Sequence, residues 1–213
     1  MSQAFAPKGK EGPLPVERPP MAAGNDQVDS LEVPEDFYDR IKDRIRERIA
    51  GELRFAGQVV DLGCGSCELT RFLARENRQR VVGVDISDGG FPEDEDAREE
   101  VDCLKADARR LDFVRDGSVD AVLSVYALHE MEKPVEVLRE ARRALRGGGV
   151  ILVVDFPRGS LAQRLWDENY YTSAEAVEML GQAGFVGIES RLVERNQLIW
   201  AKAHKAPAEG ETL

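Results

Sequence analysis

The sequence contains no apolar run long enough to cross a bilayer, and its N-terminus lacks the apolar core of a signal peptide. Basic residues are also in short supply, since 29 lysines and arginines stand against 40 aspartates and glutamates, a net charge of −11. Sequence-independent binding to nucleic acid, and binding to an anionic membrane, both need clustered basic side chains. We therefore expect neither of these partners.

Cysteine is scarce as well, with only Cys64, Cys67 and Cys103. Three cysteines do not make a disulfide framework, so we expect free thiols in a reducing cytoplasm. A zinc site would need two ligands beyond the C-x-x-C pair, and no second spaced pair exists, so we expect no metal. A redox role for the pair is the minor alternative, because a helix N-terminus lowers the pKa of a thiol.

The 213 residues, 42% of them hydrophobic, are enough for one domain with a substantial core. Residues 1–30 are rich in proline and glycine and lack a periodic apolar pattern, which predicts a disordered tail. Residues 31–205 form the predicted domain, and residues 206–213 a frayed C-terminal tail. The domain begins with a helix, because Phe37, Ile41, Ile45 and Ile49 recur four apart.

Two local patterns predict element boundaries further along the chain. A helix that begins at Pro134 should end at Gly147, Gly148 and Gly149, and the next strand should start at Val150. Thr172 and Glu175 have the spacing of a capping box, which predicts the start of another helix.

The stretch from Val59 to Leu69 is the organising feature of the domain. Four apolar or buried-strand residues lead into Gly63 and Gly65, and a helical pattern of apolar residues follows at once. This order of strand, glycine turn and helix opens doubly wound α/β folds. Glycine lets a ligand approach the backbone, and the helix N-terminus offers free N–H groups to a negative charge, so we expect a ligand here.

The details of the turn narrow the choice of ligand. Glu68 stands where a dinucleotide fingerprint needs its third glycine, and a carboxylate there would repel a pyrophosphate. The Gly-Lys-Ser/Thr of a phosphate loop is missing. The Asp-Leu-Gly-Cys-Gly run that begins at Asp61 resembles the cofactor motif of the class I S-adenosylmethionine-dependent methyltransferases, with Cys67 in place of a usual glycine. The resemblance extends from about Val59 to His204.

This resemblance implies a Rossmann-like methyltransferase fold, a single doubly wound, mostly parallel seven-stranded sheet that ends in an antiparallel hairpin. Residues 185–193 and 197–203 supply that hairpin. The cofactor would be S-adenosyl-L-methionine and the product S-adenosyl-L-homocysteine. The backbone of Gly63, Cys64 and Gly65 would hold the methionine end, with Asp61 supporting the turn and the carbonyl side of Ser124 helping.

The nucleoside end of the cofactor is predicted from the next two strands. Asp85 ends the strand that starts at residue 80, where an acid accepts hydrogen bonds from ribose hydroxyls in nucleotide-binding α/β folds. The alternative for Asp85 is a turn cap. Ile86 would lie against the adenine ring, and the family resemblance assigns Asp107 and the backbone of Ala108 to the adenine amino group.

The reaction centre should follow the strand at residues 119–125, because ligands in such sheets bind beyond the carboxyl ends of strands where the winding reverses. His129 titrates near neutral pH and is our candidate general base, and the alternative is a capping or core-edge histidine that only holds the loop. Candidate substrate contacts are Tyr126, Trp166, Tyr170 and Tyr171. The last three would form a lid or, alternatively, a packed helical turn.

The sequence thus predicts an enzyme that transfers a methyl group from S-adenosylmethionine to a small molecule. The sulfonium is already activated, so the protein mainly has to align the acceptor and exclude water. A non-enzymatic binding protein with the same cofactor motifs remains an alternative, and a nicotinamide-dependent oxidoreductase is a weaker one. Neither the acceptor nor the oligomeric state follows from the sequence.

Overall fold

The computed structural model describes residues 33–93 and 101–207. The predicted N-terminal tail, residues 1–30, lies outside the described residues, and so does most of the predicted C-terminal tail. Part of the acidic stretch between the second and third strands, residues 94–100, is also outside them. None of the described helices is long and apolar enough to pass through a membrane.

The core of the molecule is a seven-stranded sheet with the order β3-β2-β1-β4-β5-β7-β6. The first five strands run parallel to one another, while β7 pairs antiparallel with both β5 and β6. The winding reverses between β1 and β4, as predicted, and the final hairpin is antiparallel, so the predicted fold class is confirmed. The strands are β1 (Gln58–Leu62), β2 (Arg80–Asp85), β3 (Asp102–Lys105), β4 (Val119–Val125), β5 (Leu145–Asp155), β6 (Val186–Val193) and β7 (Leu198–His204).

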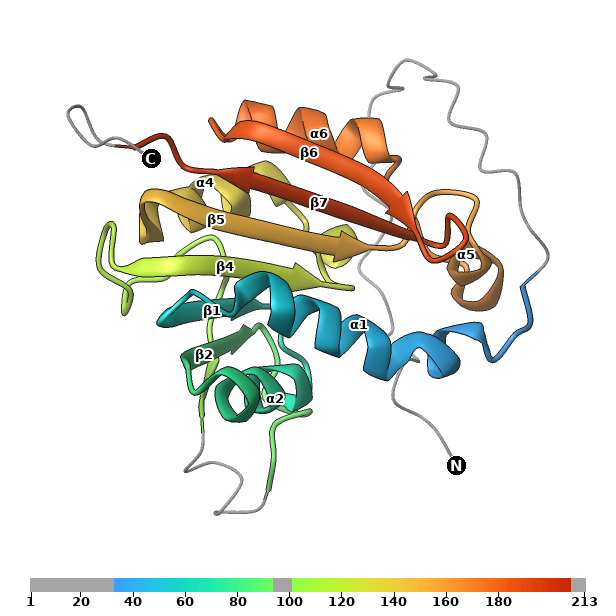
Figure 1. The fold of residues 1–213 in the computed structure, drawn as a ribbon, viewed down its shortest axis with the longest axis horizontal. Coiled ribbons are helices and arrows are strands. Elements are labelled where there is room, and N and C mark those ends of the chain that lie inside the picture. Colours follow the sequence, from blue (N-terminus) through green and yellow to red (C-terminus); the bar gives the residue numbers. More distant parts are fainter. Residues whose placement is uncertain (1–32, 94–100, 208–213) are drawn as a thin grey trace.

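Helices cover both faces of this sheet (Figure 1). They are α1 (Phe37–Leu53), α2 (Glu68–Asn77), the short 3-10 helix η1 (Leu128–Glu130), α4 (Pro134–Ala144), α5 (Leu161–Trp166) and α6 (Ser173–Gln182). Two apolar clusters separate the layers: α4 and α6 pack on one face, and α1, α2 and α5 on the other. Because both faces are buried, β4 and the second half of β5 are almost wholly apolar.

One predicted boundary was wrong. We expected Gly147, Gly148 and Gly149 to end the preceding helix and the strand to start at Val150. The helix instead ends at Ala144, and β5 runs from Leu145 through all three glycines. Gly149 explains why small residues are needed here, since a Cβ on it would lie 2.9 Å from a backbone oxygen of Arg146 and 3.1 Å from one of Asp120.

Candidate functional site

The glycine turn after β1 has no room for side chains on its inner side. Gly63 adopts a φ of +76°, and a Cβ built on it would come within 2.3 Å of the Cβ of Ala127. Its N–H donates to the carbonyl of Val84 at 2.7 Å, which ties the turn to β2. Gly65 also has a left-handed φ, +54°, but a Cβ there would meet nothing within 4 Å. The turn therefore packs against the loop after β4 on one side and leaves open space at Gly65.

Asp61 is buried beneath the turn. The hydroxyl of Thr70, in α2, donates to its carboxylate at 2.8 Å. Burial raises the pKa of Asp61 to about 6, the Thr70 hydrogen bond opposes this, and the charge of Asp85 adds to it. Asp61 thus links the end of β1 to the first turn of α2, consistent with the supporting role predicted for it.

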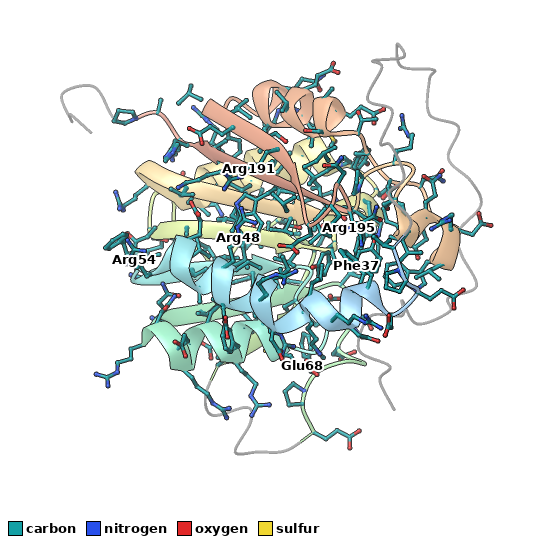
Figure 2. All side chains as sticks on the ribbon, turned by 45° about the vertical axis from the view of Figure 1, so that its right-hand side comes forward. Phe37, Arg48, Arg54, Glu68, Arg191 and Arg195 are labelled. Carbon is teal, nitrogen blue, oxygen red and sulfur yellow. A yellow bond between two sulfur atoms is a disulfide. The ribbon has the colours of Figure 1, made fainter. Side chains whose placement is uncertain are left out.

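Glu68 has a structural role that its sequence position did not reveal. Its carboxylate is paired with Arg46 and, at 3.2 Å, with Lys42, both on α1. Figure 2 labels Glu68 at this junction between the two helices. Burial alone would raise the pKa of Glu68, but the two basic partners lower it. Arg46 and Lys42 balance the charge of Glu68, so this carboxylate does not repel a pyrophosphate in the way we expected. The strand order of the sheet, rather than Glu68, distinguishes this fold from a dinucleotide-binding one.

Asp85 ends β2 with both carboxylate oxygens turned toward backbone donors. One oxygen accepts from the N–H of Gly65 at 3.0 Å, and the other accepts from the N–H of Ser87 at 2.9 Å. The turn cap that we considered as an alternative is therefore present. Each carboxylate oxygen can accept a second hydrogen bond, so a ribose contact stays a prediction. Ile86 is 63% exposed, and its contact with the adenine ring stays a prediction.

Asp107 is engaged by a residue that the sequence analysis did not consider. The guanidinium of Arg109 contacts both of its carboxylate oxygens at 2.7–3.0 Å and also reaches Glu132 at 3.3 Å. The Arg109 hydrogen bonds hold the pKa of Asp107 below its usual value. A role of Asp107 and the half-buried Ala108 in adenine binding stays a prediction, and Arg109 would have to share this carboxylate with the ligand.

Two predicted site residues, Ser124 and Tyr126, lie at the carboxyl end of β4, in the middle of the sheet. Ser124 is buried, and its hydroxyl has no hydrogen-bond partner among the described residues. Tyr126 adopts a φ of +57° and stacks on Phe156, with ring centroids 4.5 Å apart. Burial raises the pKa of Tyr126, which therefore stays protonated. The cofactor contact predicted for Ser124 and the substrate contact predicted for Tyr126 stay predictions.

His129 lies at the same edge, held by the end of β5. Its Nδ1 is 2.7 Å from a carboxylate oxygen of Asp155, and its backbone N–H donates to the other oxygen at 3.0 Å. Its Nε2 is 3.0 Å from a carboxylate oxygen of Glu168. Burial would lower the pKa of His129, but Asp155, Glu130 and Glu168 together raise it. The ring is thus oriented by one carboxylate and presents Nε2 to another.

The aromatic segment after β5 is packed. Tyr170 is 2% exposed, and its ring lies 4.5 Å from that of His129, while Trp166 stacks on Tyr38 at 5.5 Å. Tyr171 is half-buried in a bridge with Pro157. In this structure the segment covers His129. A substrate contact by these three aromatic residues stays a prediction.

The cysteines differ from our expectation of free thiols. Cys67, at the start of α2, forms a disulfide with Cys103 of β3, and Cys64 remains free with its sulfur 3.6 Å from that of Cys67. The pairing could not be seen in the sequence, because β3 lies 36 residues further along the chain. The pairing follows from the strand order, because β3 lies next to β2, and β2 lies next to β1 and the glycine turn that leads to Cys67.

We expect Cys64→Ala and Cys67→Ala each to keep the affinity for S-adenosylhomocysteine within several-fold, because the turn would bind through its backbone. Cys67→Ala should also lower the melting temperature, since it removes the disulfide. Cys103→Ala is the matched control and should lower it equally. Calorimetric titration and melting curves measure both effects. Loss of binding in folded Cys67→Ala alone would show that its side chain is needed.

Three residues of the site were not predicted from the sequence: Asp155, Glu168 and Arg109. An available signal for Asp155 was its position, an acid directly after the apolar core of a strand and at the edge where ligands bind. Glu168 had no such signal, because it follows a short helix in an irregular segment.

One group of side chains among the described residues has the spacing of metal ligands. The ligand atoms of His129, Glu130 and Glu168 all lie within 4.8 Å of one another. Both ring nitrogens of His129 already contact carboxylates, one of them the buried Asp155. A histidine held by a carboxylate at one ring nitrogen can present the other nitrogen to a metal ion or to a proton. The hydrogen-bond distance between Nε2 and Glu168 favours proton transfer here.

The sheet order and glycine turn define the Rossmann-like class I methyltransferase fold. Residues 60–153 match a family model described as a methyltransferase domain. A solved structure titled as the [4+2]-cyclase SpnF has a TM-score of 0.67 and 19% identity, and the match covers 79% of this chain and 82% of that one. At such an identity the likeness shows the fold alone.

Two curated relatives extend the comparison. The 27-O-demethylrifamycin SV methyltransferase of Amycolatopsis mediterranei is 35% identical over 123 residues, which are 53% of this chain and 44% of that protein. The demethylmenaquinone methyltransferase of Beutenbergia cavernae is 34% identical over 99 residues, 46% of this chain and 40% of that protein. Together with the fold, these matches support a class I S-adenosylmethionine-dependent methyltransferase. The chain spans less than half the length of these two relatives.

Proposed function

We propose that this chain transfers the methyl group of S-adenosylmethionine to a hydroxyl oxygen of a small-molecule acceptor. The observation that carries this proposal is the buried pair of His129 and Asp155 beyond β4 and β5. A hydroxyl is a weak nucleophile unless a base takes its proton, and an imidazole oriented by a carboxylate is such a base. The two curated relatives are named for methyl transfer to small molecules, which supports an acceptor of this class.

The residues at the sheet edge fit the cofactor. Gly63 leaves no side chain on the inner side of the turn, Asp85 keeps acceptor capacity, and Ile86 is exposed beside it. When bound, the cofactor supplies a methyl group on a positively charged sulfur. In the proposed reaction Nε2 of His129 would take the acceptor proton as the methyl–sulfur bond breaks and the methyl–oxygen bond forms, and Asp155 would stabilise the resulting imidazolium. Packed aromatic residues around His129 exclude water.

The location and the partners are proposals of the same kind. The net charge of −11 supports a small-molecule acceptor over nucleic acid or an anionic membrane. The expected cytoplasmic location stays a prediction, and the Cys67–Cys103 disulfide argues against it, since disulfides persist mainly in oxidising compartments.

The first test is ligand binding. We expect S-adenosylhomocysteine at a hundredfold excess over its dissociation constant to add about 2.7 kcal/mol to the free energy of unfolding, because it binds the folded state alone. Thermal shift measures this, with reduced nicotinamide dinucleotide as the control ligand. No shift at millimolar concentration would remove the cofactor assignment. A shift without S-adenosylhomocysteine release across metabolite pools would favour the non-enzymatic alternative.

A further inference from the structure

The proposed reaction leaves a proton on His129 that must be removed before the next turnover. Methyl transfer from a sulfonium to a neutral hydroxyl yields a neutral thioether, a neutral ether and one proton. The His129 side chain is only 4% exposed, and that of its partner Asp155 is also 4% exposed. Water therefore has little direct access to either group, and the proton needs another way out.

Asp155 is poorly placed to carry the proton away. One of its oxygens faces Nδ1 of His129 and also accepts from the backbone N–H of Phe156 at 2.8 Å. Its other oxygen accepts from the backbone N–H of His129 at 3.0 Å. These hydrogen bonds fix the carboxylate in place. The remaining nitrogen of the ring, Nε2, is the atom from which the proton can leave.

Glu168 connects Nε2 with the surface. Its carboxylate oxygen lies 3.0 Å from Nε2, and its side chain is 29% exposed. It belongs to the segment between α5 and Tyr171, which covers His129 on that side. Two other groups face the ring: Glu130, an exposed neighbour on η1, and Tyr170, whose ring packs on the imidazole. The Tyr170 hydroxyl has no hydrogen-bond partner among the described residues, whereas Glu168 lies at hydrogen-bond distance from Nε2.

We propose that Glu168 resets the general base, taking the Nε2 proton of His129 once the product has left and passing it to water. This step rests on the proposed function. The N–H bond at Nε2 breaks, an O–H bond forms on the Glu168 carboxylate, and the carboxylic acid then loses its proton to solvent. The acceptor hydroxyl and Glu168 would use Nε2 in turn.

Proton exchange at the ring tests this without knowledge of the acceptor. The chain has only two histidines, so ¹⁵N-histidine labelling of the full chain leaves His129 and His204 to distinguish by NMR. The exchange rate of the Nε2 proton with water is measured at a pH at which the His129 ring is doubly protonated in every variant. Glu168→Gln keeps the shape and the hydrogen bond but cannot take up a proton. We expect it to slow exchange by roughly a hundredfold, the low end of what a positioned proton acceptor contributes.

Two further variants complete the experiment. Glu168→Asp retains a carboxylate and should restore part of the rate, whereas a purely structural role would not distinguish aspartate from glutamine in this way. Asp167→Asn is the matched control, because Asp167 is an exposed acid next to Glu168 on the same segment, and it should exchange like the wild type. Unchanged exchange in Glu168→Gln, equal slowing in Asp167→Asn, or an Nε2 without a proton at every pH would overturn the proposal. The His204 signals and melting curves report folding of each variant, and if Glu168→Gln does not fold, Glu168→Ala takes its place.

The exchange measurement is independent of the methyl-transfer proposal. It uses neither cofactor nor acceptor, so failure of S-adenosylhomocysteine to bind would remove the proposed function and leave the exchange result intact. Conversely, normal binding with unchanged exchange in Glu168→Gln would leave the proposed function standing and remove only the reset step.

Discussion

Asp85→Ala is expected to weaken S-adenosylhomocysteine binding by roughly thirty- to several-hundredfold, or about 2–4 kcal/mol. Hydrogen bonds from two ribose hydroxyls to a carboxylate are charge-assisted and contribute about 1.5–3 kcal/mol each before water refills the gap. The mutation also removes the acceptors for the N–H groups of Gly65 and Ser87. The unliganded protein should therefore lose about 1–2 kcal/mol of stability, since each such hydrogen bond contributes about 1 kcal/mol.

Isothermal titration and unliganded melting curves separate these two effects. Asp88→Ala is the matched control, because Asp88 is an exposed carboxylate on the same turn and pairs with Lys105 rather than with Gly65. It should bind S-adenosylhomocysteine normally. Wild-type affinity in Asp85→Ala together with a lowered melting temperature would mean that Asp85 is only a turn cap, and it would remove the residue from the cofactor site.

His129→Ala should lower kcat by about a hundred- to ten-thousandfold, the range for loss of a positioned general base, while S-adenosylhomocysteine binding stays unchanged. His204→Gln is the control. His204 pairs with Val150, far along β5 from Asp155, and should keep the wild-type rate. Because the acceptor is unidentified, the rate is measured as S-adenosylhomocysteine release with an acceptor found by the metabolite screen. An undiminished rate in folded His129→Ala would show that the histidine only holds the loop.

The pH dependence of the rate gives a separate test of the Asp155 contact. A general base works in its neutral form, so the rate should rise with pH through the pKa of His129, which its acidic neighbours raise above the usual value. Asp155→Asn removes the negative charge with the strongest upward effect, and the rising limb should therefore move to lower pH. A limb that stays in place would mean that His129 does not set the pH dependence.

Short-range patterns in the sequence were sufficient for most of the fold. The boundaries of β2 and β4 agree with prediction, since each is an apolar run bounded by polar or turn residues. The capping box of Thr172 and Glu175 is present as expected, because its two hydrogen bonds join residues three apart. The boundary predicted from Gly147, Gly148 and Gly149 was wrong, because helix ends and crowded strand contacts both favour glycine. Only the position of the neighbouring backbone distinguishes a helix end from a crowded strand.

The sequence by itself therefore determined the order of the strands and of the long helices, the glycine turn and the resemblance to methyltransferases. Only the tertiary structure decided which side chains meet. Asp155 is 26 residues from His129 in the chain and Glu168 is 39, yet both contact one imidazole ring. Cys67 and Cys103 are joined across β2, and Arg109 folds back on Asp107. The physical reason is that periodicity reports the face on which a residue lies, whereas contacts between distant elements depend on strand order and register.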